Sequence, residues 1–466
     1  MFGLELHLFL LLILCMAAAF AFEFINGFHD AANAVVSVIY TNSLRPWAAI
    51  IWAGFWNFIG VIVGGIGVAM SIIYMLPLEA LTDQDIYHSI SLIGALLLSA
   101  IIWNLGTWYY GIPVSSSHTL IGSVFGVGLA YSLLPGVGTA TLPWSKISDI
   151  GLALLISPLF GFTVTIFLMF LLKRFVKSKK LFKEPHKRNP PPLWIRTIMI
   201  LTCTGISLSH GSNDGQKGVG LMMLVLIAFL PGYFALNIET DIRPLQNSLT
   251  QIENTINSVP LTDFAAPLRG DIADINSLTR DSKMQLASVA SLKEITIQQR
   301  LDLRKNILNL SSKLKTINQA EFTPLTASQK ELVKTNSATL RNYTDYVPNW
   351  VIFLTAIAIG CGTLIGWKRI VKTVGEKIGK EHLNYAQGFS SELVAASTIG
   401  LSASFGVPVS TTHVFNTAVA GSMVASKGVK NLRPDTVRTI ALAWVLTLPV
   451  VIFLSGGIFL LLRWLI

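Results

Sequence analysis

Long apolar segments recur along the whole chain and are separated by short polar stretches. They cover about 4–22, 48–75, 90–108, 150–172, 197–235, 348–366, 386–404 and 440–462. Each reaches the roughly 18 residues that a helix needs to cross a bilayer. Shorter apolar stretches near 28–40, 113–134 and 411–426 follow polar motifs and suit half-helices or re-entrant segments. The pattern predicts an all-α polytopic membrane protein with about 10–12 transmembrane segments.

Residues 237–347 interrupt this pattern with a polar and nearly neutral insert. The insert holds 13 Lys or Arg residues and 12 Asp or Glu residues. Its apolar residues recur at helical spacing, for example Leu245, Leu249, Ile252 and Ile256. We therefore expect a helical hairpin outside the bilayer.

Charge is scarce elsewhere and is unevenly placed. Charged residues make up 13% of the chain, apolar residues make up 52%, and the net charge is +10. This composition excludes a disordered chain, a secreted disulfide scaffold and an ordinary soluble enzyme. The excess Lys and Arg lie in the loops 173–196, 367–385 and 427–438. By the positive-inside rule these loops are cytoplasmic, so no nucleic-acid partner is needed to explain the charge. The insert is then periplasmic, and both termini lie outside.

Two motifs occur twice in the chain. The segment 111–118 reads GIPVSSSH and the segment 406–413 reads GVPVSTTH, while 27–30 reads GFHD and 211–214 reads GSND. The two motifs of each copy are 85 residues apart once the 111-residue insert is left out. Such spacing indicates an internal repeat.

The loop charges give the two copies opposite orientations in the membrane. An inverted-topology repeat is typical of secondary transporters, whose binding site lies at the repeat interface near mid-membrane. The predicted domains are transmembrane repeat 1 (1–172), a basic cytoplasmic loop (173–196), the first part of repeat 2 (197–236), the insert (237–347) and the second part of repeat 2 (348–466).

The Ser/Thr motifs suggest a site for an anion. In both copies Gly and Pro end one helix, and the following Ser and Thr suit the N-cap of the next. A half-helix that begins inside the membrane directs free N–H groups at a small oxyanion such as phosphate or sulfate. A helix kink with an ordinary cap is the alternative. The candidate substrate-binding residues are Ser115, Ser116, Ser117, Thr119, Ser410, Thr411, Thr412 and Lys217, of which Lys217 could instead pair with Asp214.

The few polar residues embedded in apolar segments suggest a site for a coupled cation or proton. Ionisable groups inside hydrocarbon cost roughly 2.5–3.5 kcal/mol each, so they need a function or a partner. Clusters of carboxylate and amide oxygens suit hard cations, and a buried carboxylate can carry a proton. Buried, hydrogen-bonded groups that only hold a broken helix are the alternative. The candidates are Glu23, Asn26, His29, Asp30, Asn33, Asn213, Asp214, Glu392, His118 and His413, and His210 lies in the same repeated motif.

The paired motifs resemble those of the inorganic phosphate transporter (Pit) family. That family has two copies of a signature containing Gly-x-Asn-Asp, each followed downstream by Gly-x-Pro-x-Ser-x-x-His. Copy two matches through 211–214, whereas copy one has His29 where the family often has Asn. Lys217 replaces the signature Asn that Asn33 keeps. Both departures are similar to the bacterial low-affinity branch.

The resemblance implies that the Ser/Thr motifs bind phosphate and that the Asn/Asp signatures bind the cation or proton. It implies proton-coupled import at the bacterial inner membrane, with a neutral divalent metal–phosphate complex, for example of Mg²⁺, as one form of substrate. A Na⁺ site becomes doubtful where Asn is replaced. No resident cofactor or structural metal is expected, and a homodimer is left open.

Three other functions remain as alternatives to proton-coupled phosphate import. A sodium-coupled phosphate or sulfate symporter of the same fold would carry the same motifs. A membrane-embedded Ser/His hydrolase has the required residue types but lacks a Gly-x-Ser-x-Gly elbow. A receptor or scaffold would act through the insert. The sequence favours a transporter, and therefore not an enzyme.

Overall fold

The chain forms helices throughout the part that the structure describes. The computed structural model describes residues 4–76, 86–135, 142, 144–186, 189–320 and 323–465. Within these ranges there is no β-strand, and only an isolated bridge joins Gly379 to Leu432. The chain divides into two compact units. We call residues up to 225 together with those from 347 onward the helical body, and residues 226–346 the insert bundle.

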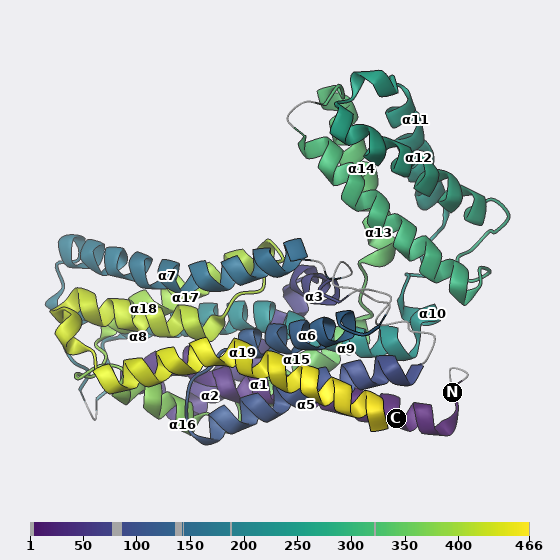
Figure 1. The fold of residues 1–466 in the computed structure, drawn as a ribbon. Helices are drawn as coiled ribbons and strands as arrows, with labels where there is room; N and C mark the ends of the chain where they lie inside the picture. The colour runs from purple at the N-terminus through teal and green to yellow at the C-terminus, as the bar shows by residue number, and fades with distance from the viewer. Residues whose placement is uncertain are drawn as a thin grey trace. The chain divides into compact units, whose positions relative to one another are not determined.

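The helical body contains long helices joined by short connections (Figure 1). Its helices are α1 (Leu6–Tyr40), α2 (Pro46–Val63), α3 (Gly67–Ile73), α5 (Ile86–Tyr109), α6 (Ser116–Ser132), α7 (Trp144–Phe175), α8 (Leu193–His210), α9 (Gln216–Phe229, whose last turn enters the insert bundle), α15 (Asn349–Thr363), α16 (Lys368–Lys372), α17 (Tyr385–Ser404), α18 (Thr411–Lys427) and α19 (Pro434–Leu465). Two π-helical turns, Gly211–Gly215 and Thr373–Lys377, and two short 3₁₀ turns, Lys179–Phe182 and Val429–Asn431, complete it.

Five of the described helices are long and apolar enough to cross a membrane. They are Leu6–Tyr40, Pro46–Val63, Ile86–Tyr109, Ile147–Phe175 and Pro434–Leu465. Large apolar side chains on these helices face outward; Phe453 on α19 is 80% exposed and Leu159 on α7 is 69% exposed. Exposed apolar surfaces on helices of this length are typical of contact with lipid. The prediction of an all-α polytopic membrane protein is confirmed, while the number of passes stays a prediction.

Helices from the two predicted repeats are interleaved. Helix α6, which follows the first Ser/Thr motif, packs on α19, and α18, which follows the second, packs on α7. In the same way α1 packs on α15 and α2 packs on α8. Residues far apart in the sequence therefore share one interior. The first turn of α1 and the last turn of α19 lie at the same end of the helical body (Figure 1).

The helix breaks fall at the Ser/Thr motifs rather than at the Asp motifs. Gly111 and Gly406 have φ angles of 68° and 67°, a left-handed conformation that glycine adopts without strain, and each ends a helix. The expected half-helix at 28–40 is absent, because α1 continues unbroken through the 27–30 motif. In copy two the motif forms the π-helical turn Gly211–Gly215, which widens the helix without ending it.

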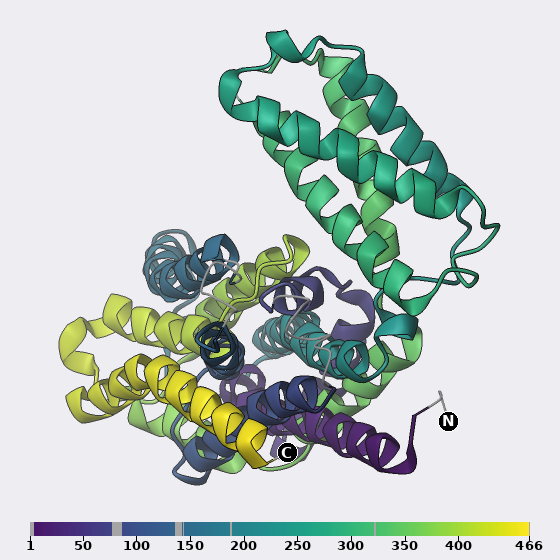
Figure 2. The ribbon, with the colours of Figure 1, turned by 45° about the vertical axis from the view of Figure 1, so that its right-hand side comes forward.

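The described residues of the insert bundle form four long helices, so the expected helical hairpin was too simple. They are α11 (Arg243–Asn257), α12 (Ala266–Leu286), α13 (Ile297–Gln319) and α14 (Ala327–Thr344), preceded by the short α10 (Pro231–Phe234), with a 3₁₀ turn at Leu261–Asp263. They run side by side (Figure 2). The apolar spacing of 245–256 does form a buried face, as predicted. Helices α12 and α14 were both missed, and α14 buries few apolar side chains, among them Val333, Leu340 and Tyr343.

Close backbone contact between α1 and α15 depends on glycine, which gives a testable prediction. A Cβ at Gly362 would lie 2.9 Å from the carbonyl carbon of Phe24. We expect Gly362→Ala to destabilise the protein by about 1–3 kcal/mol, because backbone has to move. The matched control is Gly106→Ala on α5, where a Cβ meets nothing within 4 Å. Thermal unfolding in detergent measures both variants, and equal melting temperatures would contradict the prediction.

Candidate functional site

Two buried carboxylates from different repeats meet in the interior of the helical body. Asp30 on α1 is 1% exposed and Asp214 in the π-helical turn is fully buried. The Oδ2 atoms of both accept hydrogen bonds from the Ser116 hydroxyl, at 3.3 and 3.4 Å. Both also accept from the Thr411 hydroxyl, at 3.1 Å each. All four repeated motifs therefore converge on one pair of oxygen atoms.

The hydroxyls are held there by two helix N-termini. Ser115 is the N-cap of α6, and its side chain accepts the backbone N–H of His118 at 3.1 Å. Ser410 caps α18 in the same way with His413, also at 3.1 Å. The first N–H groups of a helix lack intrahelical partners and carry partial positive charge. Two such ends face the aspartates, so the carboxylates lie where a bound anion would be stabilised.

His210 lies between the two aspartates. Its Nε2 atom is 3.7 Å from Asp30 Oδ2 and 3.5 Å from Asp214 Oδ2. Its Nδ1 atom is 3.0 Å from Asn57 Oδ1, and the Asn57 amide nitrogen donates to Thr363 at 2.9 Å. Because Asn57 Oδ1 can only accept, Nδ1 carries a proton in this network. The Nε2 atom must then hold a second proton or face a metal ion, since a lone pair would repel two carboxylates.

The same three residues form a potential metal-ligand set. One ligand atom each from Asp30, His210 and Asp214 lies within 4.8 Å of the others. Sequence reasoning placed His210 in the repeated motif but did not assign it to the site. The available signal was its position four residues before Asp214, which puts both on one face of a helical segment.

Lys217 pairs with Asp214. Its ammonium is 2.6 Å from Asp214 Oδ1, and it donates to the Val409 carbonyl at 3.1 Å and to the Ser117 hydroxyl. An ammonium has three donors, and here each has a protein partner. The structure thus places Lys217 as the salt-bridge partner of Asp214, the second of the two roles expected from the sequence, rather than as a free phosphate ligand.

Asp30 has a different set of partners on its other oxygen. Its Oδ1 atom accepts the Thr412 hydroxyl at 2.5 Å and lies 3.5 Å from His29 Nδ1. Asn33, one turn further along α1, is 2% exposed. Within the described chain, neither polar atom of its side chain has a hydrogen-bond partner. The Oδ2 atoms of the two aspartates therefore share the same hydroxyl donors, whereas their Oδ1 atoms have different partners.

Asn213 positions the segment that leads into α18. Its side-chain nitrogen donates to the Val407 carbonyl at 3.2 Å, and its Oδ1 accepts the Val409 N–H at 3.4 Å. Thr119, a predicted phosphate ligand, instead donates to the Ser115 carbonyl within its own helix at 3.0 Å. Asn213 thus holds the site in place, and Thr119 supports the first turn of α6.

Other predicted coupling residues lie in neighbouring pairs. Glu23 accepts from Asn26 at 3.3 Å, and Glu392 accepts from Thr202 at 2.5 Å; all of these side chains are buried. The ring centroids of His118 and His413 lie 4.4 Å apart, and that of His413 lies 3.9 Å from the Trp444 ring, tilted by 31°. Within the described residues, no direct hydrogen bond or ion pair links Glu23, Glu392, His118 or His413 to the aspartates.

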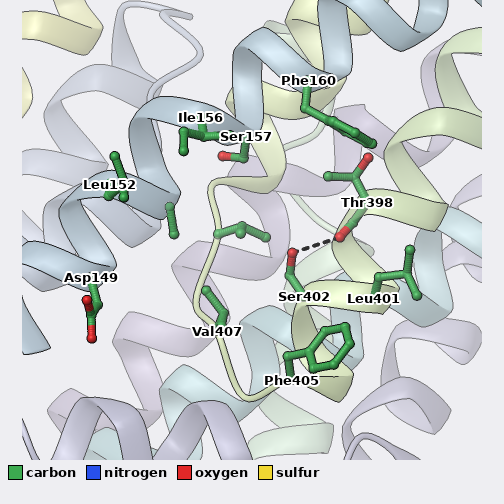
Figure 3. A pocket seen from close by; sticks show the side chains of 12 residues that line it. Asp149, Leu152, Ile156, Ser157, Phe160, Thr398, Leu401, Ser402, Phe405 and Val407 are labelled. Carbon is green, nitrogen blue, oxygen red and sulfur yellow. Dashed lines mark hydrogen bonds between the residues drawn. The ribbon is translucent and has the colours of Figure 1, made fainter. Parts of the chain in front are cut away.

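A cavity of about 480 Å³ adjoins the segment before α18 (Figure 3). It lies between α7 and α17 and is mostly apolar, with the hydroxyls of Ser157, Thr398 and Ser402 in its wall. Val407 and Val409 line it, and these are the residues whose backbone Asn213 holds. One segment therefore forms a wall of the cavity and part of the aspartate site.

Comparison with known proteins identifies the family. The model of the phosphate transporter family matches residues 26–455, nearly the whole chain. The chain belongs to the phosphate transporter family. It is 38% identical to the low-affinity inorganic phosphate transporter PitA of Escherichia coli (strain K12) and 37% identical to PitB of that strain, and each alignment covers 98% of this chain and 97% of the relative.

More distant similarity extends over the same length. A probable low-affinity inorganic phosphate transporter of Bacillus subtilis (strain 168) is 28% identical over 92% of this chain and 90% of its own. A solved structure, "The sodium-dependent phosphate transporter", matches the fold with a TM-score of 0.55 at 20% identity, covering 98% of this chain and 100% of that one. The chain is thus a membrane phosphate transporter of the Pit family, and its relatives are named as transporters, not enzymes.

His210 offers a direct test of the assembled site. We expect His210→Gln to lower phosphate uptake by about tenfold or more, because it removes a group that can carry positive charge 3.5 and 3.7 Å from two buried carboxylates, and a factor of ten corresponds to only about 1.4 kcal/mol. The control is His382→Gln, at an exposed histidine outside the site. Uptake by equal amounts of folded protein in proteoliposomes measures the effect. Equal rates in the two variants would show that His210 has no part in transport.

Proposed function

We propose that this transporter imports inorganic phosphate together with protons. The observation that carries the proposal is the position of the Asp30 and Asp214 carboxylates at the N-termini of α6 and α18. Phosphate needs the same N–H groups and the hydroxyls of Ser116 and Thr411, which now donate to the carboxylates. Phosphate and ionised aspartate therefore compete for one set of donors.

The charge of the site supports coupling to a cation. Two buried carboxylates and the single ammonium of Lys217 leave one net negative charge when His210 is neutral. A phosphate anion a few ångströms away would be repelled strongly in this water-poor interior. A proton shared by Asp30, Asp214 and His210 removes that charge and frees the donors for phosphate. Phosphate binding and proton binding then favour each other.

We also propose that a neutral divalent metal–phosphate complex is a carried form of the substrate. Carboxylate and imidazole groups from Asp30, His210 and Asp214 are suitable ligands for a divalent metal ion. In that state the metal would lie between the Oδ2 atoms and phosphate would lie on the two helix ends. A neutral complex avoids moving net charge against the membrane potential.

Phosphate is favoured over sulfate because the site presents carboxylate acceptors. At neutral pH phosphate still carries protons that it can donate, whereas sulfate carries none. Sodium coupling is the second candidate, since the solved structure of similar fold is named as a sodium-dependent phosphate transporter. The ammonium of Lys217 disfavours it, because it already occupies the oxygen atoms beside Asp214. We retain the proposed orientation, with the basic loops in the cytoplasm of a bacterial cell and the insert bundle in the periplasm.

An imposed proton gradient tests the coupling. If one proton enters with each phosphate, proteoliposomes whose outside is one pH unit more acidic than the inside should accumulate phosphate about tenfold. One pH unit supplies about 1.4 kcal/mol per proton, which corresponds to a factor of ten. Asp30→Asn and Asp214→Asn should abolish accumulation while leaving folded protein. Uptake that ignores both the gradient and an uncoupler would contradict proton coupling, and wild-type uptake in both variants would remove the aspartates from the mechanism.

Metal dependence tests the form of the substrate. If the neutral complex is carried, labelled Mg²⁺ or another divalent ion should enter with phosphate, and chelation should slow phosphate uptake. His210→Gln should weaken the metal dependence, because it removes one of the three ligands. Phosphate uptake that stays unchanged in EDTA, with no co-entry of metal, would restrict the substrate to free phosphate.

A further inference from the structure

The two copies of the repeat carry different residues at the position three after the site aspartate. The repeat aligns Asp30 with Asp214 and places Asn33 where copy two has Lys217. In each copy this residue lies three positions after the aspartate, on the same face of the helical segment. The residue three positions after the aspartate is therefore an amide, Asn33, in copy one and an ammonium, Lys217, in copy two.

In copy two the ammonium is enclosed by oxygen atoms. Lys217 Nζ contacts the carboxylate of Asp214, the hydroxyl of Ser117 and the carbonyl of Val409. Lys217 is 1% exposed, and Ser117 is equally buried. Carboxylate, hydroxyl and carbonyl oxygens are the ligands that small hard cations prefer. The oxygen atoms around the Lys217 ammonium are thus of the kinds that would coordinate a free cation.

In copy one no Lys or Arg among the described residues pairs with Asp30; the nitrogen beside its Oδ1 atom is Nδ1 of His29, at 3.5 Å. The repeat aligns Thr412 with Ser117, and Thr412 donates directly to Asp30 Oδ1 at 2.5 Å. In copy two a lysine nitrogen lies between the corresponding groups. Among the described residues, neither polar side-chain atom of Asn33 has a hydrogen-bond partner. Asp30 therefore lacks the fixed ammonium that pairs with Asp214.

We propose that Lys217 is a tethered cation that permanently fills one of two equivalent cation positions and so sets how many free cations move with each phosphate. This inference rests on the proposed coupling of transport to cations. Lys217 neutralises Asp214 in every state of the cycle, and only Asp30 exchanges its counter-ion. An asparagine at 217 would reproduce the flank of copy one and would leave a second, unfilled position formed by Asp214, Ser117 and Val409.

The test compares Lys217→Asn with the swapped variant Asn33→Lys/Lys217→Asn and with the wild type. In proteoliposomes, Lys217→Asn should carry one more positive charge per phosphate, measured from the membrane potential at which net phosphate flux is zero. Its uptake should rise about tenfold when NaCl replaces choline chloride, whereas wild-type uptake should not. The swapped variant should lose this sodium requirement, because its single ammonium now lies beside Asp30.

If the Lys217→Asn variant folds but does not transport, its binding of sodium can still be measured. NaCl should raise the melting temperature of purified Lys217→Asn by about 2 °C or more relative to choline chloride, with no comparable rise in the wild type. Lys173→Asn is the matched control, since Lys173 donates to the Ala425 carbonyl on the exposed surface. Its response should equal that of the wild type.

Either of two results overturns the inference. The first is a Lys217→Asn protein whose charge per phosphate is that of the wild type. The second is a Lys217→Asn protein that sodium does not stabilise beyond the wild type and Lys173→Asn. Failure of the proposed proton coupling is recognised separately, because it would show as a wild-type protein that ignores the proton gradient.

Discussion

The structure depends on one arrangement, in which two helix N-termini face two buried carboxylates. Each N-terminus exists because a left-handed glycine ends the preceding helix and a serine caps the next. Each carboxylate is stable in the interior because hydroxyls from both helices donate to it. The interleaved packing of α6 on α19 and of α18 on α7 brings the two ends together. Without that packing Asp30 and Asp214 would lose the hydroxyl donors that come from the other repeat.

This arrangement explains why a transporter of an anion carries acids in its site. Helix N-termini attract anions, and in the described state hydroxyls from the first turns of α6 and α18 donate to the protein's own carboxylates. Under the proposed mechanism, phosphate binds when a cation takes over the carboxylates, and this links the two ligands through a shared set of donors. Lys217 pairs with one aspartate, whereas His210 bridges both.

Much of this was predictable from the sequence, for identifiable reasons. Apolar segment length predicted the membrane helices, and the repeated motifs predicted which residues converge, because Gly-Pro and Ser/Thr act locally on the backbone. The unbroken course of α1 was missed because the Asp motif has a different backbone in each copy. In copy two it forms a π-helical turn, whereas in copy one it is part of a regular α-helix. The bridging position of His210 was missed because it depends on Asn57 and Thr363, which no local pattern connects. The insert holds two helices more than the expected hairpin, α12 and α14, and α14 buries too few apolar residues to be recognised by spacing alone.

A structure determined with phosphate bound tests the central claim most directly. The account predicts phosphate oxygens at the first N–H groups of α6 and α18, with Ser116 and Thr411 donating to phosphate and no longer to Asp30 and Asp214. It also predicts a proton or metal ion between the two carboxylates, visible as a shortened separation or as density. Phosphate bound elsewhere, with both hydroxyls still on the aspartates, would contradict the account.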